Sequence, residues 1–427
     1  MLSSTDLTST DTIVLSTTLR SLAQQYEIIG DTPSAITNYT KSCVLNPKSV
    51  LANLLISKLY IKQKEYSEAC KHLKHVLNID AGHEEAAVIM AELLFRQGLL
   101  PASKFHYLHI IQCHPQNYNA LEQLIVILHL TNNLDECTQV FAQLDNDLGD
   151  SGLAFCRGLY LKFLGDVEQS MRLFAGCRKD GIWGLKATKH LIGMYLNPSQ
   201  RPLGIEMQSS AAPEKNGIIA AREMVGDLGG RGFPTEFLEC ECLIASQIPK
   251  NIETAISIYS KNLAKTPECT KSLHGISIGH VLLNQKQKAK PYLKKIVDME
   301  WCIESHVEIE SSLILLSELL INAGKPDRAV PLLKKAVQAN QSCCTAWEYL
   351  GTCAEKHSDF VESAECYRQS WAIRKSTWVG YRLACMYLKS AQYTHAIDVC
   401  HDVLQVDAGY ACIRSDVLVK ARSMLRG

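Results

Sequence analysis

The amino-acid sequence predicts an all-α protein: a right-handed superhelical solenoid of stacked helix pairs, ended by a capping C-terminal helix. Three observations favour this fold class. Residue types recur with a period of 34 along the chain, as from Tyr26 to Tyr60. Hydrophobic residues make up 47% of the chain but aromatic residues only 7%, as expected where Leu, Ala and Ile pack helices together. Outside 201–234, the apolar–polar alternation typical of strands is missing.

The first three copies of the repeat set the pattern. The copies, each with the small residue of its first helix, are 16–47 with Ala23, 50–81 with Ser57, and 84–115 with Ala91. A 34-residue period with this pattern is typical of the tetratricopeptide repeat, a helix–turn–helix unit. Small residues let the two helices approach closely, and large apolar residues form the buried stripe of each helix. Because one unit cannot bury its own apolar face, neighbouring units must stack.

The same frame returns in the second half of the chain. The best copy begins at Cys344, where Trp347, Leu350 and Gly351 match the opening of the repeat and Tyr367 fills the aromatic position of the second helix. The other copies cover 118–147, 151–181, 236–267, 270–300 and 310–341, with a last one around Leu383. We therefore expect helix pairs along almost the whole chain.

Glycine and proline divide the predicted solenoid. They are dense over 201–234, and such breakers favour a linker or loop with at most a short helix at 217–225. The sequence thus predicts an N-terminal tetratricopeptide repeat block over 1–200 and a C-terminal block over 235–427. Residues 411–426 are predicted to form the capping helix, because a solenoid needs a final helix to cover its exposed core.

Composition and charge exclude several classes of function. Lys+Arg and Asp+Glu balance at 44 − 44 = 0, so no bulk charge attracts nucleic acid. No segment reaches the roughly 18 apolar residues needed to span a bilayer, and the N-terminus lacks a secretory pattern, so we expect no membrane insertion and an intracellular protein. The 17 cysteines are scattered, without zinc-ligand spacing, so no metal site is expected.

The motifs that point to chemistry are weak. Gly275, Ser277 and Gly279 form the Gly-x-Ser-x-Gly pattern of a hydrolase, but that site needs a strand before the serine and this serine falls in a predicted helix. The glycines at 226–232 follow no strand, so a nucleotide loop is not indicated. The sequence therefore predicts a protein that is not an enzyme and needs no cofactor.

Polar residues on the predicted inner face are the candidates for partner binding. At the positions where some repeat proteins hold a peptide's C-terminal carboxylate, the chain has Leu54 with Lys58 and Val88 with Glu92, which does not match that clamp. The C-terminal repeats and last helix instead offer Glu348, Thr352, Glu355, Arg382, Lys389, Arg414, Lys420 and Arg422. The alternative is that these charges only keep the surface soluble.

Several strings resemble one family. Residues 342–351 (SCCTAWEYLG), 379–384 (VGYRLA) and 396–404 (AIDVCHDVL) resemble the C-terminal part of tetratricopeptide repeat protein 21, a large subunit of intraflagellar transport complex A. The resemblance implies a non-catalytic scaffold in retrograde ciliary transport and in protein localisation to the cilium. It also implies contacts with the WD-repeat subunits of that complex, and a location in the cytoplasm and cilium, at the axoneme and basal body.

Two other functions compete with this one at the level of sequence. The first is a peptide-binding adaptor or co-chaperone unrelated to cilia, which the repeat alone would allow. The second is an enzyme built on the solenoid, and the only observation that favours it is the Gly-x-Ser-x-Gly pattern around Ser277.

Overall fold

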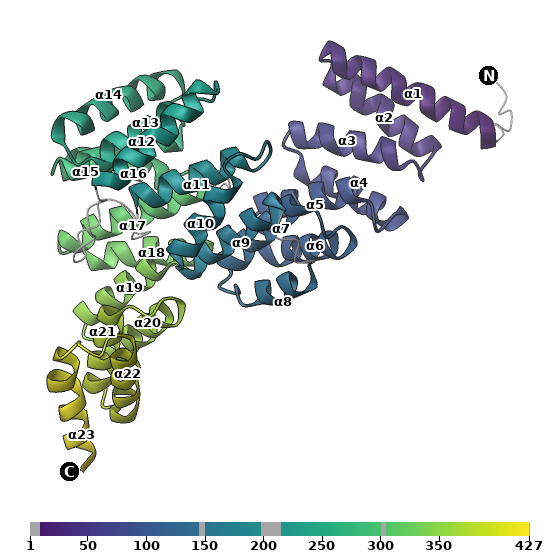
Figure 1. Cartoon of the computed structure of the whole chain (residues 1–427). Coiled ribbons are helices and arrows are strands. Elements are labelled where there is room, and N and C mark those ends of the chain that lie inside the picture. Colours follow the sequence, from purple (N-terminus) through teal and green to yellow (C-terminus); the bar gives the residue numbers. More distant parts are fainter. Residues whose placement is uncertain (1–8, 145–149, 198–214, 300–304, 427) are drawn as a thin grey trace. The chain divides into compact units, whose positions relative to one another are not determined.

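The computed structural model describes the chain except for residues 1–8, 145–149, 198–214, 300–304 and 427. Among the described residues there are helices but no strand (Figure 1), so the all-α prediction is confirmed. The helices are α1 (Ser9–Ile29), α2 (Thr32–Leu45), α3 (Val50–Lys62), α4 (Tyr66–Ile79), α5 (Glu84–Arg96), α6 (Leu100–Cys113), α7 (Tyr118–Leu130), α8 (Glu136–Gln143), α9 (Ser151–Leu164), α10 (Val167–Cys177), α11 (Gly184–Leu196), α12 (Lys215–Gly230), α13 (Glu236–Ala245), α14 (Pro249–Lys265), α15 (Thr270–Leu282), α16 (Lys286–Val297), α17 (His306–Asn322), α18 (Pro326–Ala339), α19 (Cys344–Lys356), α20 (Phe360–Ile373), α21 (Thr377–Lys389), α22 (Tyr393–Val406) and α23 (Val419–Arg426).

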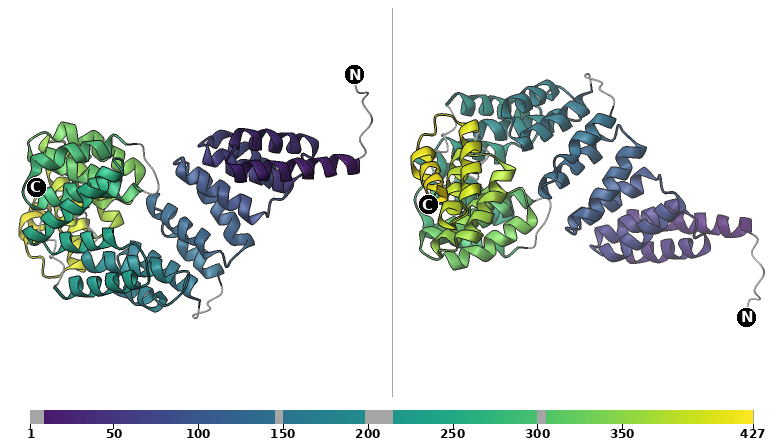
Figure 2. Two further views of the ribbon diagram at one scale, coloured as in Figure 1. Left: turned by 90° about the horizontal axis from the view of Figure 1, so that it is seen from above. Right: turned by 90° about the horizontal axis from the view of Figure 1, so that it is seen from below.

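The helices form pairs that stack on one another. In most pairs the first helix packs on the second, as α3 does on α4 and α19 on α20, and most second helices pack on the first helix of the next pair, as α20 does on α21. Both views of Figure 2 show this succession of neighbouring hairpins. The predicted tetratricopeptide solenoid is therefore confirmed.

The turn inside each pair explains the period at the level of the backbone. Gly30, Lys64, Gly98 and Asn132, each 34 residues after the previous one, all have positive φ, at 89°, 63°, 73° and 55°. The next residue's N–H then bonds back to the first helix, as Glu65 does to the carbonyl of Tyr60 at 2.9 Å. This left-handed helix ending is easiest for glycine, and Asn is the next best choice.

Contact density divides the chain into two compact units, Met1–Ile127 and Leu128–Gly427. The predicted division at 201–234 is a different one and stays a prediction. The part of that segment before 215 lies outside the described residues. The part after it contains α12, which is longer than the expected short helix because Ala221, Met224, Val225 and Leu228 give it a buried stripe.

Within the second unit, two segments far apart in sequence meet. The loop between α18 and α19 lies against the end of α7: the Gln341 N–H donates to the Leu130 carbonyl at 2.8 Å. The Ser342 hydroxyl donates to the His129 carbonyl at 2.6 Å. A row of repeats that returns to its own start in this way must curve, because a straight stack would never bring these residues together.

The repeat that begins at Cys344 packs as its sequence pattern indicates, with one difference. Gly351 is buried, and a Cβ added there would lie 3.0 Å from the ring of Tyr367, so only glycine fits without a shift. Trp347, which matches the opening of the repeat, is only half-buried. Its indole N–H donates to the Gln341 carbonyl at 3.0 Å, which holds the ring at the edge of the core.

A capping helix ends the chain, as predicted. It opens with a wide turn over Arg414–Leu418 and continues as α23. Ile413 and Val417 are fully buried and Leu418 is nearly so, whereas Leu425 is 50% exposed. The buried face of the cap therefore ends near Ala421, before the last turn.

Candidate functional site

The predicted partner-binding residues of the C-terminal repeats form a network of their own. The Glu355 carboxylate on α19 lies 3.0 Å from the Arg382 guanidinium and 3.4 Å from the Lys389 ammonium, both on α21. Each cation also lies over an aromatic ring, Arg382 over Trp378 and Lys389 over Phe360. These three predicted residues are thus brought together, but mainly to connect two neighbouring repeats.

Two other predicted residues point into the packing between α19 and α20. Glu348 is 1% exposed, and its carboxylate accepts a hydrogen bond from the Ser370 hydroxyl at 3.3 Å. It is therefore not available to a partner, and its prediction as a contact residue is corrected. Thr352 bonds to the Glu348 carbonyl at 2.9 Å and to the Tyr367 hydroxyl at 3.1 Å, so its hydroxyl is used inside the repeat.

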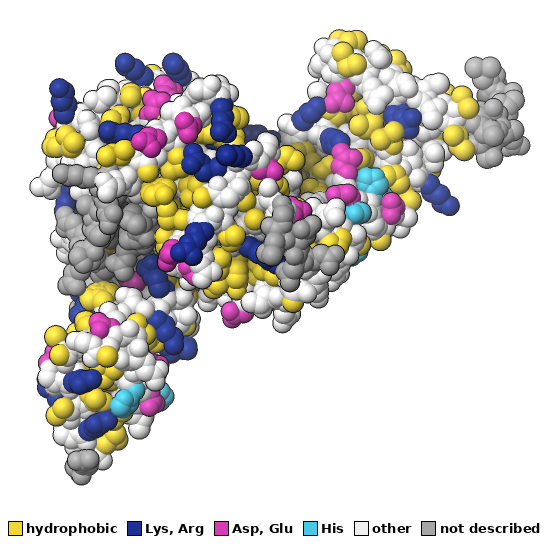
Figure 3. Space-filling view, in the orientation of Figure 1, with side chains coloured by type: hydrophobic (Ala, Val, Ile, Leu, Met, Phe, Trp, Pro, Cys, Tyr) yellow, Lys and Arg dark blue, Asp and Glu magenta, His cyan; other side chains and the backbone are white. Residues whose placement is uncertain are grey.

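The basic residues of the cap lie on the surface. Arg414, Lys420 and Arg422 are exposed, and the Arg422 guanidinium lies 3.3 Å from the His401 ring. We call these three residues the cap surface. Figure 3 shows basic and acidic side chains interspersed over the C-terminal helices rather than one field of a single sign. Of the predicted residues, the cap surface is the part best placed to meet a partner.

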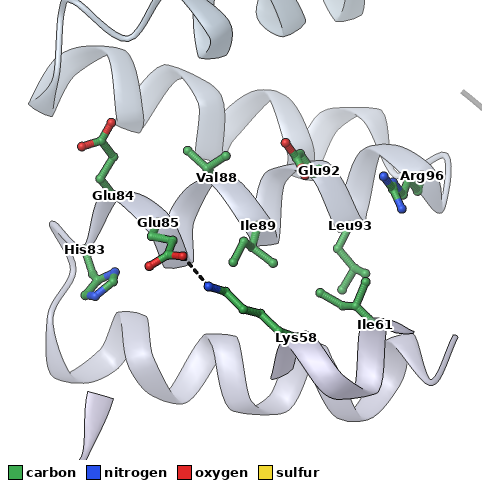
Figure 4. A pocket seen from close by; sticks show the side chains of 10 residues that line it. All are labelled: Lys58, Ile61, His83, Glu84, Glu85, Val88, Ile89, Glu92, Leu93 and Arg96. Carbon is green, nitrogen blue, oxygen red and sulfur yellow. Dashed lines mark hydrogen bonds and ion pairs between the residues drawn. The ribbon is translucent and has the colours of Figure 1, made fainter. Parts of the chain in front are cut away.

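The sequence did not predict a groove in the first unit, although three of the residues that line it were considered as clamp positions. It lies between α3 and α5, has a volume of about 820 Å³ and is shown in Figure 4. We call it the α3–α5 groove. Its lining residues are Lys58, Ile61, His83, Glu84, Glu85, Val88, Ile89, Glu92, Leu93 and Arg96. Lys58, Val88 and Glu92 are the clamp positions that failed to match the carboxylate pattern, and the repeat places all three in one cavity.

Local sequence explains how α5 presents this wall. The helix starts at His83, whose ring Nδ1 accepts the Ala86 N–H at 3.2 Å and so caps the first turn. Ala87 and Ala91 are buried small residues, which let α5 approach its neighbours. The opposite stripe of α5 then faces the groove, with Val88 and Glu92 one turn apart.

The groove has more carboxylates than basic side chains of Lys or Arg, three against two. Lys58 reaches across from α3 and pairs with the Glu85 carboxylate at 2.5 Å (Figure 4). Glu84 accepts a hydrogen bond from the Asn117 amide at 2.8 Å. Loss of hydration in the groove raises the pKa of Glu92, and the nearby Arg96 opposes the rise. The groove thus combines an apolar floor with an exposed carboxylate, Glu92, whose pKa is raised.

Catalytic and metal chemistry find little support. Ser277 is fully buried in the middle of α15, and its hydroxyl donates to the Leu273 carbonyl at 2.8 Å, so it cannot be the exposed nucleophile of a hydrolase turn. Across the part of the chain that the structure describes, no three His, Cys, Asp or Glu side chains gather where they could hold a metal ion. None of the described helices is both long and apolar enough to cross a membrane.

Comparisons with known proteins agree over most of the chain. A family model described as the tetratricopeptide repeat protein 21 C-terminal ARM domain matches residues 229–422, and one described as the TT21 fifth ARM repeats domain matches 84–196. A tetratricopeptide repeat model matches 51–83. Tetratricopeptide repeat protein 21B of Xenopus laevis is 29% identical over 411 residues, which cover 91% of this chain and 31% of that protein.

The chain belongs to the tetratricopeptide repeat protein 21 family. The human protein 21B is 31% identical over 327 residues, which cover 72% of this chain and 25% of that protein. The chain thus spans about a third or less of the length of these relatives. Among solved structures, a chain of the APC/C hetero-tetramer Cut9–Hcn1 aligns with a TM-score of 0.45 at 14% identity, covering 96% of this chain and 83% of that one.

Family and fold agree on a coarse function. A stack of tetratricopeptide repeats offers long surfaces beyond its packing positions, and such surfaces bind other proteins. The chain is therefore a repeat scaffold for protein–protein interaction, as its relatives and its repeats indicate.

Proposed function

We propose that this chain is a non-catalytic subunit of intraflagellar transport complex A, which acts in retrograde ciliary transport and in the localisation of proteins to the cilium. The observation that carries the proposal is the family match over 84–196 and 229–422. In this proposal the chain resides in the cytoplasm and the cilium, at the axoneme and basal body. Its partners are the WD-repeat subunits of the complex.

The cap surface is the docking region that we assign to these partners. Arg414, Lys420 and Arg422 are exposed on the surface. Glu348 and Thr352, in contrast, are used in the packing of their own repeat. Exposed charges of this kind contribute little to the stability of a fold, so they can be changed without unfolding it. Charge complementarity across an interface, in contrast, affects both partner choice and the rate of association.

A pull-down from ciliated cells tests the proposal. The tagged full chain should recover WD-repeat subunits of complex A, identified by mass spectrometry. The double variant Lys420→Glu, Arg422→Glu should recover less of them, while its circular dichroism spectrum and melting stay unchanged. The matched control is Lys288→Glu, Lys294→Glu on α16, which makes the same change of charge at exposed positions away from the cap.

The outcomes separate the docking region from the function itself. If the cap variant recovers as much of the WD-repeat subunits as the wild-type chain does, the docking surface lies elsewhere on the chain. Recovery of chaperones, or of no complex A subunit at all, by the folded wild-type chain would contradict the function and favour an adaptor unrelated to cilia.

A further inference from the structure

The α3–α5 groove lies in the first unit and has no part in the function proposed above. We propose that it binds an amphipathic helix of about three turns from a partner protein, which lays apolar side chains on the groove floor and presents one Lys or Arg to Glu92. The proposal goes beyond the transport function, since it holds or fails for the purified chain alone. Four features of the groove support it: its length, its floor, its charges and the prior engagement of several of its polar side chains.

Length and volume fit a short helix. The lining residues of α5 run from Glu84 to Arg96, which is about 18 Å at roughly 1.5 Å per residue. A partner helix of about 12 residues, or three turns, matches this length. The volume of about 820 Å³ falls within the range of roughly 300–1,000 Å³ that is usual for binding pockets.

The floor is apolar. Val88, Ile89 and Leu93 contribute from α5, and Ile61 contributes from α3 (Figure 4). Leu93 is almost fully buried, whereas Val88, Ile89 and Ile61 are only half-buried. The half-buried side chains leave apolar surface in contact with water, and covering it with an apolar helix face would be favourable.

The charges favour a basic partner. Three carboxylates line the groove, Glu84, Glu85 and Glu92, against the cations of Lys58 and Arg96. Lys58 is paired with Glu85, and Glu84 is bonded to Asn117. Glu92 lies between these groups and Arg96, and loss of hydration raises its pKa. A Lys or Arg from the partner would place an opposite charge beside this exposed carboxylate.

The walls select a helix over an extended segment. Both walls are helices, whose backbone groups in the middle of each helix are already bonded within it. The lining residues include no Asn or Gln, and several of the polar side chains that are present already have a partner: Lys58 with Glu85, and Glu84 with Asn117. An extended segment would therefore find few partners to replace the lost hydration of its N–H and C=O groups, whereas a helix satisfies these groups itself.

The test is a selection of displayed 14-residue peptides on the purified full chain, followed by fluorescence anisotropy with the enriched sequences. Enriched peptides should carry apolar residues at i, i+3 or i+4, and i+7, with a Lys or Arg beside them. Glu92→Lys should weaken their binding about tenfold or more, and should itself select peptides with Asp or Glu in place of the basic residue. Val88→Glu should abolish binding.

The matched control is Glu68→Lys, the same substitution on α4 at a carboxylate outside the groove that pairs with the exposed Lys71. It should bind the selected peptides as the wild-type chain does. All variants are compared by circular dichroism, so that a loss of binding is read only from folded protein.

Four results would overturn the proposal. The first is that no peptide is enriched, and the second is that folded Glu92→Lys and Val88→Glu bind the enriched peptides unchanged. The third is that a proline in the middle of an enriched peptide leaves its affinity intact, which would mean an extended occupant. The fourth is a concentration-dependent dimer that Val88→Glu abolishes, which would make the occupant a second copy of the chain.

Discussion

Gly380 is the position where a single methyl group tests the packing of the solenoid. It lies in α21, buried between α20 and α22. A Cβ added there would clash with Val403 Cγ2 and would lie 2.8 Å from Trp371 Cζ3. Carbon atoms in contact prefer about 3.5–4.0 Å. Val403 is 0% exposed and Trp371 7% exposed, so neither can move aside into water.

The expected cost of Gly380→Ala is the balance of two terms. Overpacking a well-filled core costs about 1–3 kcal/mol. Replacing glycine by alanine inside a helix by itself raises the free energy of unfolding by about 1 kcal/mol. The net loss is therefore about 0–2 kcal/mol, and we expect the upper half of this range because the added Cβ clashes with two buried side chains. A loss of about 2 kcal/mol equals a factor of roughly 30 in the opening equilibrium of the affected repeats.

Gly193→Ala on α11 is the matched control. Its added Cβ would meet no atom within 4 Å, so only the helix term of about 0.5–1 kcal/mol remains and the variant should be slightly more stable. Hydrogen–deuterium exchange on the full chain measures both variants locally. Gly380→Ala should speed exchange in α20–α22 and leave α9–α11 unchanged, because repeats interact mainly with their neighbours. Equal exchange in α20–α22 for wild type and Gly380→Ala would refute the packing of these three helices.

Three further predictions follow from the same structure. Trp347→Ala should cost about 2 kcal/mol in thermal unfolding, below the roughly 3–5 kcal/mol of a fully buried aromatic, because the ring is half-buried; a larger loss would place it in the core. Arg382→Glu with Lys389→Glu should lower the melting temperature by placing three carboxylates together, and Glu355→Lys added to that pair should restore part of it. Burial lowers the pKa of His274 to about 4, below the usual value of about 6.5. Between these two pH values the unfolded chain therefore binds a proton on His274 that the folded chain does not bind. Stability should therefore fall as the pH drops from about 6.5 to 4, and His274→Gln should flatten that slope in denaturation curves.

The repeat frame could be predicted from sequence because it rests on local chemistry. Small residues such as Ala23 and Ala91 are fully buried at their expected positions. The period of 34 coincides with the left-handed turn residues Gly30, Lys64 and Gly98. Each of these features depends on residues within one repeat or its neighbour, and the pattern of one repeat reports them directly.

The candidate site could be predicted only in part, since it depends on side-chain geometry and on distant contacts. Sequence spacing placed Glu348 on the inner face, but could not show that Ser370 of the next helix would enclose it. It noted Lys58 and Glu92 separately, without the cavity that joins them. The contact of Ser342 with His129 depends on the small rotations of all the repeats between them, which no local pattern encodes.

Movement inside the cilium tests the central claim most directly. The full chain with a fluorescent tag is imaged in living ciliated cells beside a labelled WD-repeat subunit of complex A. We predict particles that contain both labels and travel along the axoneme toward the cell body. A diffuse signal without directed particles, in cells where the WD-repeat subunit itself moves normally, would contradict the claim that this chain acts in retrograde ciliary transport.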